Sequence, residues 1–346
     1  MISKNNVQEE IFELPIQIPP PIKSYLPISI MSNIAFANRR DNSWVLNNFI
    51  QLFIPDNAEK LESFPFQDFM YFDQNLFQVN NVNDNNHIFK SDRIISELIY
   101  WIRHNNYIVV YADEYEIPFT RFYKKRHILH SQFIYGYDEC LQVFFATNFM
   151  EDNKIGKFTI AFNDLQKAIF SESTIKLFEH DITWGNRNTL HKVILIRYLA
   201  NRQMFYNHGI NKEYILNELY NYWKSNNSSN YCGFFTGKLK GTWGINVYQK
   251  IIEILEEKPE ELDYRMFHVL YEHKWFMMER LRLFSINNRN LKALESVFKN
   301  ADRLRFLCIK YRFSKNKDIL QRMINLLKDI RGEEMRILSD VLSQYY

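Results

Sequence analysis

Apolar residues in the second half of the chain recur at the three- and four-residue spacing of amphipathic helices. This pattern predicts helices over 190–205, 212–223, 245–257, 261–284, 291–311 and 318–342. Strand-like alternation disappears beyond about Trp184. We therefore expect an all-helical domain over 185–346.

The middle of the chain mixes helix and strand patterns. A helix near 91–104 is followed by 107–111, whose β-branched and aromatic residues predict a buried strand. Two more strands are predicted over 131–135 and 141–146, joined by a hairpin turn at 136–139. A fourth strand over 158–161 and a helix over 162–170 complete this region.

The N-terminal region begins with a proline-rich segment. Residues 14–30 contain five prolines and are expected to be extended or turn-like. From Asp41 the pattern becomes helical and predicts the first buried helix, with Asp41 as its cap. The fold class expected is α+β: an extended arm over 1–25, a helix packed on a small antiparallel sheet over 26–184, and the helical domain.

Composition excludes several classes of protein. The 346 residues carry a net charge of +3, which gives no electrostatic reason to bind nucleic acid or an anionic membrane. The N-terminus has no apolar leader, and no window is long enough for a membrane helix. Cys140, Cys232 and Cys308 are far apart, so neither a disulfide framework nor a zinc knuckle is expected. We expect a cytoplasmic protein with no cofactor and no metal.

The predicted hairpin carries a candidate acid–base pair. His130 opens its first strand, and Asn148 lies at the end of the second. The first residue of one strand and the last of the next lie side by side across a hairpin. We therefore expect Asn148 to hydrogen-bond to the imidazole of His130, which fixes the tautomer and orientation of a general base.

Several short motifs surround this pair and carry a resemblance. They are Asp113-Glu-Tyr-Glu-Ile-Pro118, Tyr123, His130, Phe133-Ile-Tyr-Gly-Tyr-Asp138 and Asn148, with Trp243-Gly-Ile245 to Tyr248, Asp263 to His268 and Glu272-His-Lys274 in the helical half. Together they resemble the butirosin biosynthesis protein H family. The N-terminal domain of that family is similar to papain-like cysteine peptidases, so the resemblance implies a papain-like core over 26–184.

The resemblance also implies a function. The family moves an acyl or aminoacyl group from a carrier-protein thioester to an amine in secondary-metabolite biosynthesis. By this match His130 is the base and Asn148 the orienting residue. The implied partners are an acyl or peptidyl carrier protein, bearing the acyl group on phosphopantetheine, and a small-molecule amine acceptor.

The nucleophile departs from the family pattern. Papain-like folds place a cysteine at the start of the first buried helix, and the stretch from Arg40 to Leu46 contains none. Ser43, followed by an aromatic residue, is the best candidate, with Asn42 the neighbouring possibility. A serine at a helix start is in general an N-cap, and this role explains Ser43 without any chemistry. The alternative function is therefore an inactive homologue that binds a carrier protein or partner enzyme. A peptidase is disfavoured, because serine with a His–Asn pair is poorly suited to an unactivated amide.

Other polar groups have two readings each. Asp113 is either a turn-forming residue or a carboxylate in the wall of the active site. The basic run from Arg121 to Arg126 is either a solvated face or a docking surface for an acidic carrier domain or a phosphopantetheine arm. His268 and His273 are five residues apart, the wrong spacing for a zinc helix. We expect Lys274 to belong to a salt-bridged helix seam instead.

Overall fold

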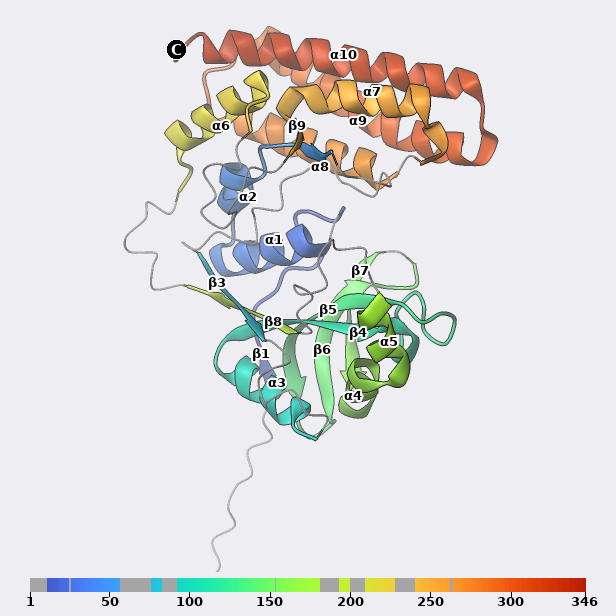
Figure 1. The fold of residues 1–346 in the computed structure, drawn as a ribbon. Helices are drawn as coiled ribbons and strands as arrows, with labels where there is room; N and C mark the ends of the chain where they lie inside the picture. The colour runs from blue at the N-terminus through green and yellow to red at the C-terminus, as the bar shows by residue number, and fades with distance from the viewer. Residues whose placement is uncertain are drawn as a thin grey trace, which may run out of the picture. The chain divides into compact units, whose positions relative to one another are not determined.

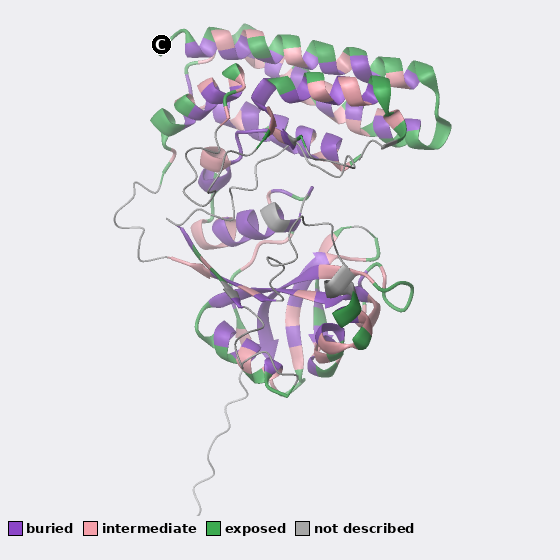
Figure 2. Ribbon diagram, in the orientation of Figure 1, coloured by how far each residue is buried: buried purple, intermediate pink, exposed green. Residues whose placement is uncertain are grey.

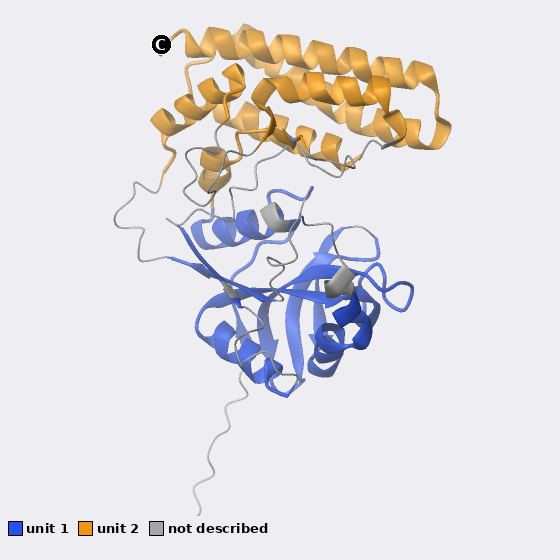
Figure 3. Cartoon of the chain, viewed as in Figure 1, with its two compact units in different colours: residues 1–40, 73–206 blue, residues 41–72, 207–346 orange. Residues whose placement is uncertain are grey.

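The chain forms two compact units, one of which is discontinuous in sequence (Figure 3). The computed structural model describes residues 11–24, 26–56, 76–82, 92–152, 154–180, 193–199, 209–227, 240–261 and 264–346. The sheet unit comprises 1–40 and 73–206, and the helical unit comprises 41–72 and 207–346. Residues 41–72 therefore belong with the C-terminal helices.

The sheet unit is built on one antiparallel sheet (Figure 1). Its strands run in the order β3-β8-β4-β5-β6-β7, and β1 pairs with β5. Their bounds are β1 Ile11–Glu13, β3 Phe77–Val82, β4 Asn106–Asp113, β5 Leu129–Asp138, β6 Val143–Phe149, β7 Ile155–Ala161 and β8 Val193–Tyr198. The expectation of an antiparallel sheet followed by a helical region is confirmed.

Helices cover both faces of this sheet (Figure 1). They are α1 Leu26–Arg39, α3 Ile94–Arg103, α4 Phe162–Phe170 and α5 Glu172–His180. On one face, Asn38 of α1 donates a hydrogen bond to the hydroxyl of Tyr107 at 3.2 Å. On the other, Phe162 of α4 contacts Phe144 with ring centroids 4.5 Å apart. The sheet core is thus closed by α1 on one side and by α3 and α4 on the other (Figure 2).

Three expectations for the sheet unit are wrong. Residues 193–198 form β8 rather than a helix, because an unbroken apolar run suits a strand with neighbours on both edges. Residues 26–30 begin α1, since Pro27 in a first helical turn removes no intrahelical bond. Gly136 to Asp138 continue β5, where they pair with β1, so the turn lies at 139–142.

The helical unit confirms most of the predicted helices. Its elements are α2 Ser43–Asn48, β2 Phe53–Pro55, α6 Lys212–Lys224, β9 Gly241–Trp243, η5 Gly244–Asn246, α7 Val247–Glu257, η6 Pro259–Glu261, α8 Arg265–Leu281, α9 Asn288–Ser314 and α10 Lys317–Leu342. The helix expected from Asp41 is a six-residue helix, because β2 then pairs antiparallel with β9. No helix in the described ranges is long and apolar enough to cross a membrane.

A buried ion pair ties four helices of this unit together. The ammonium of Lys274 on α8 donates to both carboxylate oxygens of Glu334 on α10, at 2.6 and 2.8 Å. The hydroxyls of Tyr222 on α6 and Tyr248 on α7 also donate to Glu334, at 3.1 and 2.8 Å. Burial lowers the pKa of Lys274, and Glu334 opposes this shift. Lys274 thus belongs to a salt-bridged seam, as expected, but in the core.

Two further polar residues of α8 support the segment that carries α2. The guanidinium of Arg280 donates to the carbonyls of Val45, Leu46 and Phe49 at 2.6 to 3.1 Å, which satisfies the C-terminal end of α2. The Nε2 of His273 lies 2.7 Å from the carbonyl of Ile50. Burial lowers the pKa of His273 well below its usual value, and the charges of Lys274 and Arg280 add to the shift.

The first prediction concerns the buried pair. Lys274→Met leaves the carboxylate of Glu334 uncompensated and should lower the free energy of unfolding by about 3–5 kcal/mol. The double variant Lys274→Met/Glu334→Gln keeps acceptors for both tyrosines and removes the charge, so it should recover part of that loss. Urea denaturation of the three proteins measures this. A double variant less stable than Lys274→Met contradicts the argument.

The second prediction concerns pH. Because His273 has a depressed pKa when folded, only the unfolded chain binds this proton as the pH falls below about 6.5. Stability should therefore fall below pH 6.5, by at most about 1.4 kcal/mol per pH unit from this residue. In His273→Gln, which keeps a donor for Ile50 but does not titrate, the loss between pH 7.5 and 5.5 should be smaller. An equal loss in both proteins would show that His273 does not contribute.

Candidate functional site

The imidazole of His130 is held by a buried carboxylate at one end of the sheet. His130 is the second residue of β5 and pairs with Ala112 of β4. Its Nδ1 lies 2.8 Å from Oε1 of Glu114, whose side chain is 3% exposed. The His130 side chain is 40% exposed, and its Nε2 has no hydrogen-bond partner within the described ranges. A neutral imidazole bonded this way donates through Nδ1 and presents Nε2 as an acceptor.

Asn148 lies beside His130, as the hairpin pattern led us to expect. Its side-chain nitrogen is 3.4 Å from Nδ1 of His130 and 3.3 Å from Oε1 of Glu114. The same nitrogen lies 2.9 Å from Oε1 of Gln132 and 3.0 Å from the carbonyl of Ser131. Asn148 is fully buried. The amide of Asn148 thus lies against both the imidazole of His130 and the carboxylate of Glu114. Glu114 makes the shorter contact with Nδ1 of the ring, at 2.8 Å against 3.4 Å.

Glu114 was missed in the sequence analysis. It begins η2 Glu114–Glu116, directly after β4 ends at Asp113. Because Ala112 pairs with His130, Glu114 lies two positions past the residue opposite the imidazole. The sequence contained one signal for Glu114. It is an acidic residue just beyond a buried strand, and that strand is next to the strand of His130. The hairpin pattern by itself predicts the orienting role for Asn148 alone.

A second histidine–carboxylate pair lies close along the chain. The Nδ1 of His127 is 2.6 Å from Oδ2 of Asp113, and its ring stacks on Tyr115 with centroids 4.1 Å apart. Asp113 also accepts hydrogen bonds from the backbone amides of Tyr115 and Ile128, both at 3.1 Å, and from the hydroxyl of Ser173 at 3.3 Å. Asp113 is therefore the turn-forming residue of the two readings, and it closes the base of the segment 114–128.

The imidazole of His130 lies on the α4 side of the sheet. On β6, Phe144 and Asn148 are four residues apart and share one face. Phe144 packs against Phe162 of α4, and Asn148 contacts His130. The helix α1 covers the opposite face (Figure 1). Any residue that assists His130 in the sheet unit would therefore lie on the α4 side of the sheet.

Ser43 lies in the helical unit, and its hydroxyl already has a partner. It is the first residue of α2 and is 6% exposed. Both its hydroxyl and its backbone amide donate to Oδ1 of Asp41, at 2.5 and 2.8 Å. Ser43 belongs to the helical unit and His130 to the sheet unit. The structure thus brings His130 and Asn148 together in the sheet unit, whereas Ser43 lies in the helical unit.

No metal-binding geometry occurs among the described residues. Within them, no three histidine, cysteine, aspartate or glutamate side chains converge as ligands. His273 bonds to the carbonyl of Ile50, and Nδ1 of His268 lies 3.3 Å from the guanidinium of Arg305. Cys140 is exposed in the turn after β5 and Cys308 is buried in α9, whereas Cys232 lies outside the described residues.

Comparison with known proteins adds no assignment, since no family model and no curated protein sequence matches the chain.

The third prediction concerns Asp113. Asp113→Ala leaves two backbone amides and His127 without their acceptor, so it should lower the free energy of unfolding by about 2–3 kcal/mol. Hydrogen exchange at the amides of Tyr115 and Ile128 should accelerate more than exchange in β6. The matched control is Asp152→Ala, at a residue exposed on the surface of the same unit. Unchanged exchange at the two amides would contradict the role given to Asp113.

Proposed function

We propose that the sheet unit is a papain-like domain and that the protein transfers an acyl or aminoacyl group from a carrier-protein thioester to a small-molecule amine. The observation that carries the proposal is the geometry of His130, whose Nδ1 is bonded to buried Glu114 while the ring remains 40% exposed. A buried carboxylate that fixes the ring leaves Nε2 available as a general base. The resemblance of the surrounding motifs supplies the substrate class.

The reaction needs one proton to be moved. The nitrogen of the amine attacks the thioester carbonyl, a carbon–nitrogen bond forms, and the carbon–sulfur bond breaks. Nε2 of His130 accepts the proton lost by the attacking nitrogen, and the resulting imidazolium returns it to the departing thiolate. Glu114 holds the ring in position through both steps by accepting from Nδ1–H, and the side-chain nitrogen of Asn148 donates to Glu114. An exchange of this kind needs no redox partner or metal.

Two serines are candidates for a covalent acyl intermediate. Ser43 is the residue indicated by the sequence, but its hydroxyl donates to Asp41. The first buried helix of the sheet unit is α1, and Ser24 lies just before its start and is largely buried. Applying the papain-like rule to this helix makes Ser24 a second position to test. Because α1 covers the face opposite His130, Ser24 does not face the proposed base, so an adduct on Ser24 would require another base. The geometry of the sheet unit therefore favours direct attack by the amine, without an acyl-enzyme.

A second candidate function is supported by a specific observation. The hydroxyl of Ser43 is bonded to a carboxylate and largely buried. This environment suits a structural serine, so the protein would then bind a carrier protein or partner enzyme without catalysis. The basic run from Arg121 to Arg126 adds little support for docking. Two of its lysines, Lys124 and Lys125, are already paired with Glu116 and Glu151.

The fourth prediction tests catalysis. The wild-type protein should convert acyl thioesters of N-acetylcysteamine and hydroxylamine into hydroxamates, with the released thiol measured by absorbance. His130→Ala should lower the rate by at least about a hundredfold, which is the usual contribution of a general base. Glu114→Gln should lower it less, because the ring stays in place but loses a charged partner. The matched control is His104→Ala, an exposed histidine of the same unit.

Intact mass measurement distinguishes the routes. An acyl adduct on the wild type that is lost in Ser43→Ala or in Ser24→Ala identifies the nucleophile. Turnover without any adduct, unchanged in both variants, indicates direct transfer. Absence of turnover with every thioester, together with binding to a phosphopantetheine-loaded carrier protein, would replace catalysis with the binding function.

A further inference from the structure

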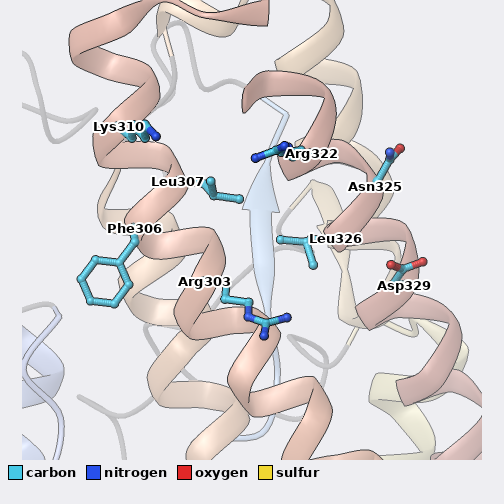
Figure 4. Close-up of a pocket in the computed structure, with 8 residues that line it drawn as sticks. All are labelled: Arg303, Phe306, Leu307, Lys310, Arg322, Asn325, Leu326 and Asp329. Atoms are coloured by element: carbon cyan, nitrogen blue, oxygen red, sulfur yellow. The ribbon is translucent and has the colours of Figure 1, made fainter. Parts of the chain in front are cut away.

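A groove in the helical unit has an apolar floor and a basic rim. It lies between α9 and α10 and encloses about 550 Å³ (Figure 4). Its apolar side chains are Phe306, Leu307 and Leu326, and its cations are Arg303, Lys310 and Arg322. Asp329 is the one acidic residue that lines it. The groove is thus amphipathic and carries a net positive charge.

The apolar side chains that line the groove are partly or largely exposed, and Leu307 and Leu326 are half-buried. Phe306 is 59% exposed, and on the same helix Phe313 is 88% exposed. Isolated apolar residues on a surface are normal, but Phe306 lines a groove together with Leu307 and Leu326. Covering them would remove apolar area from water, which is the usual source of affinity at an interface.

The cations are concentrated at one end of the groove. Figure 4 shows Lys310 and Arg322 at one end, and Arg303 and Asp329 at the other. Within the described part of the chain, none of the three cations forms an ion pair. The Lys310–Arg322 end therefore carries two positive charges, whereas Arg303 and Asp329 at the opposite end are of opposite charge. A ligand that complements this groove has an apolar stripe and carboxylates beside it.

The shape of the groove favours a helix as the ligand. Arg303 and Lys310 are seven residues apart on α9, which corresponds to about 10 Å or two helical turns. The groove is lined by residues from both helices and is partly open to solvent. A small molecule would remain largely exposed there, whereas small-molecule sites usually enclose their ligand. A helix that lies along the groove covers it with its own side chains at positions i, i+3, i+4 and i+7.

We propose that the groove between α9 and α10 binds an acidic amphipathic helix of a partner protein. The apolar stripe of that helix covers Phe306, Leu307 and Leu326, and its carboxylates pair with Lys310 and Arg322. Charge at such a rim speeds association and selects the partner. The inference is independent of the proposed transferase activity, because it uses only residues of the helical unit.

The fifth prediction tests this surface with the full-length protein and a labelled synthetic helix that has leucine at i, i+3, i+4 and i+7 and glutamate at the flanking positions. Lys310→Glu/Arg322→Glu should weaken binding by about tenfold or more in fluorescence anisotropy. The control is Lys299→Glu/Lys328→Glu, which makes the same charge change at exposed positions of the same helices outside the groove. Circular dichroism verifies that both variants are folded.

Further measurements locate the contact. Phe306→Ser should weaken binding of the glutamate peptide without changing net charge, and bound peptide should slow hydrogen exchange in 303–326. A peptide with lysine in place of glutamate should not bind. The proposal is overturned if both double variants bind equally, or if no peptide binding depends on the groove. It is also overturned if decanoate or anionic vesicles occupy the groove and the peptide does not.

Discussion

The register of β4 on β5 decides which side chains meet at the candidate site. Ala112 pairs with His130, so the chain that leaves β4 brings Glu114 within 2.8 Å of the imidazole. A slip of one residue would turn His130 to the other face of the sheet. Asp113 fixes the same end of the pair by accepting hydrogen bonds from both sides of the segment 114–128. The site therefore depends on backbone pairing before it depends on any side chain.

The sequence predicted the site in part, for identifiable reasons. The proximity of His130 and Asn148 follows from hairpin geometry alone, and the structure shows it. Glu114 could not be predicted from that hairpin, because it follows β4, which lies outside the β5–β6 hairpin. Its contact with His130 depends on the pairing of β4 with β5. The turn itself was misplaced, since β1 extends β5 to Asp138 and approaches Gly136 so closely that a Cβ there would lie 2.5 Å from a carbonyl oxygen. Long-range pairing supplied what local patterns lack.

The fold was predictable where one face of an element is polar. The long helices of the second half have one apolar and one polar face, and their positions were predicted to within a few residues. β8 is flanked by strands on both edges, so its apolar run has no polar face that distinguishes strand from helix. Polar residues of α8 show the converse. His273, Lys274 and Arg280 resemble candidates for chemistry in sequence, yet they satisfy backbone carbonyls and a buried carboxylate.

The discontinuity of the helical unit has a consequence for how the protein can be divided. Trp44, Val45 and Phe49 are buried, and Arg280 donates to the carbonyls of two of them. A fragment that stops at residue 206 would keep α2 but lose α8, which carries Arg280. A contiguous cut cannot separate the two units. Isolating the sheet unit requires excision of 41–72 and a linker in its place, and the helical unit requires that excised piece to be joined to its N-terminus.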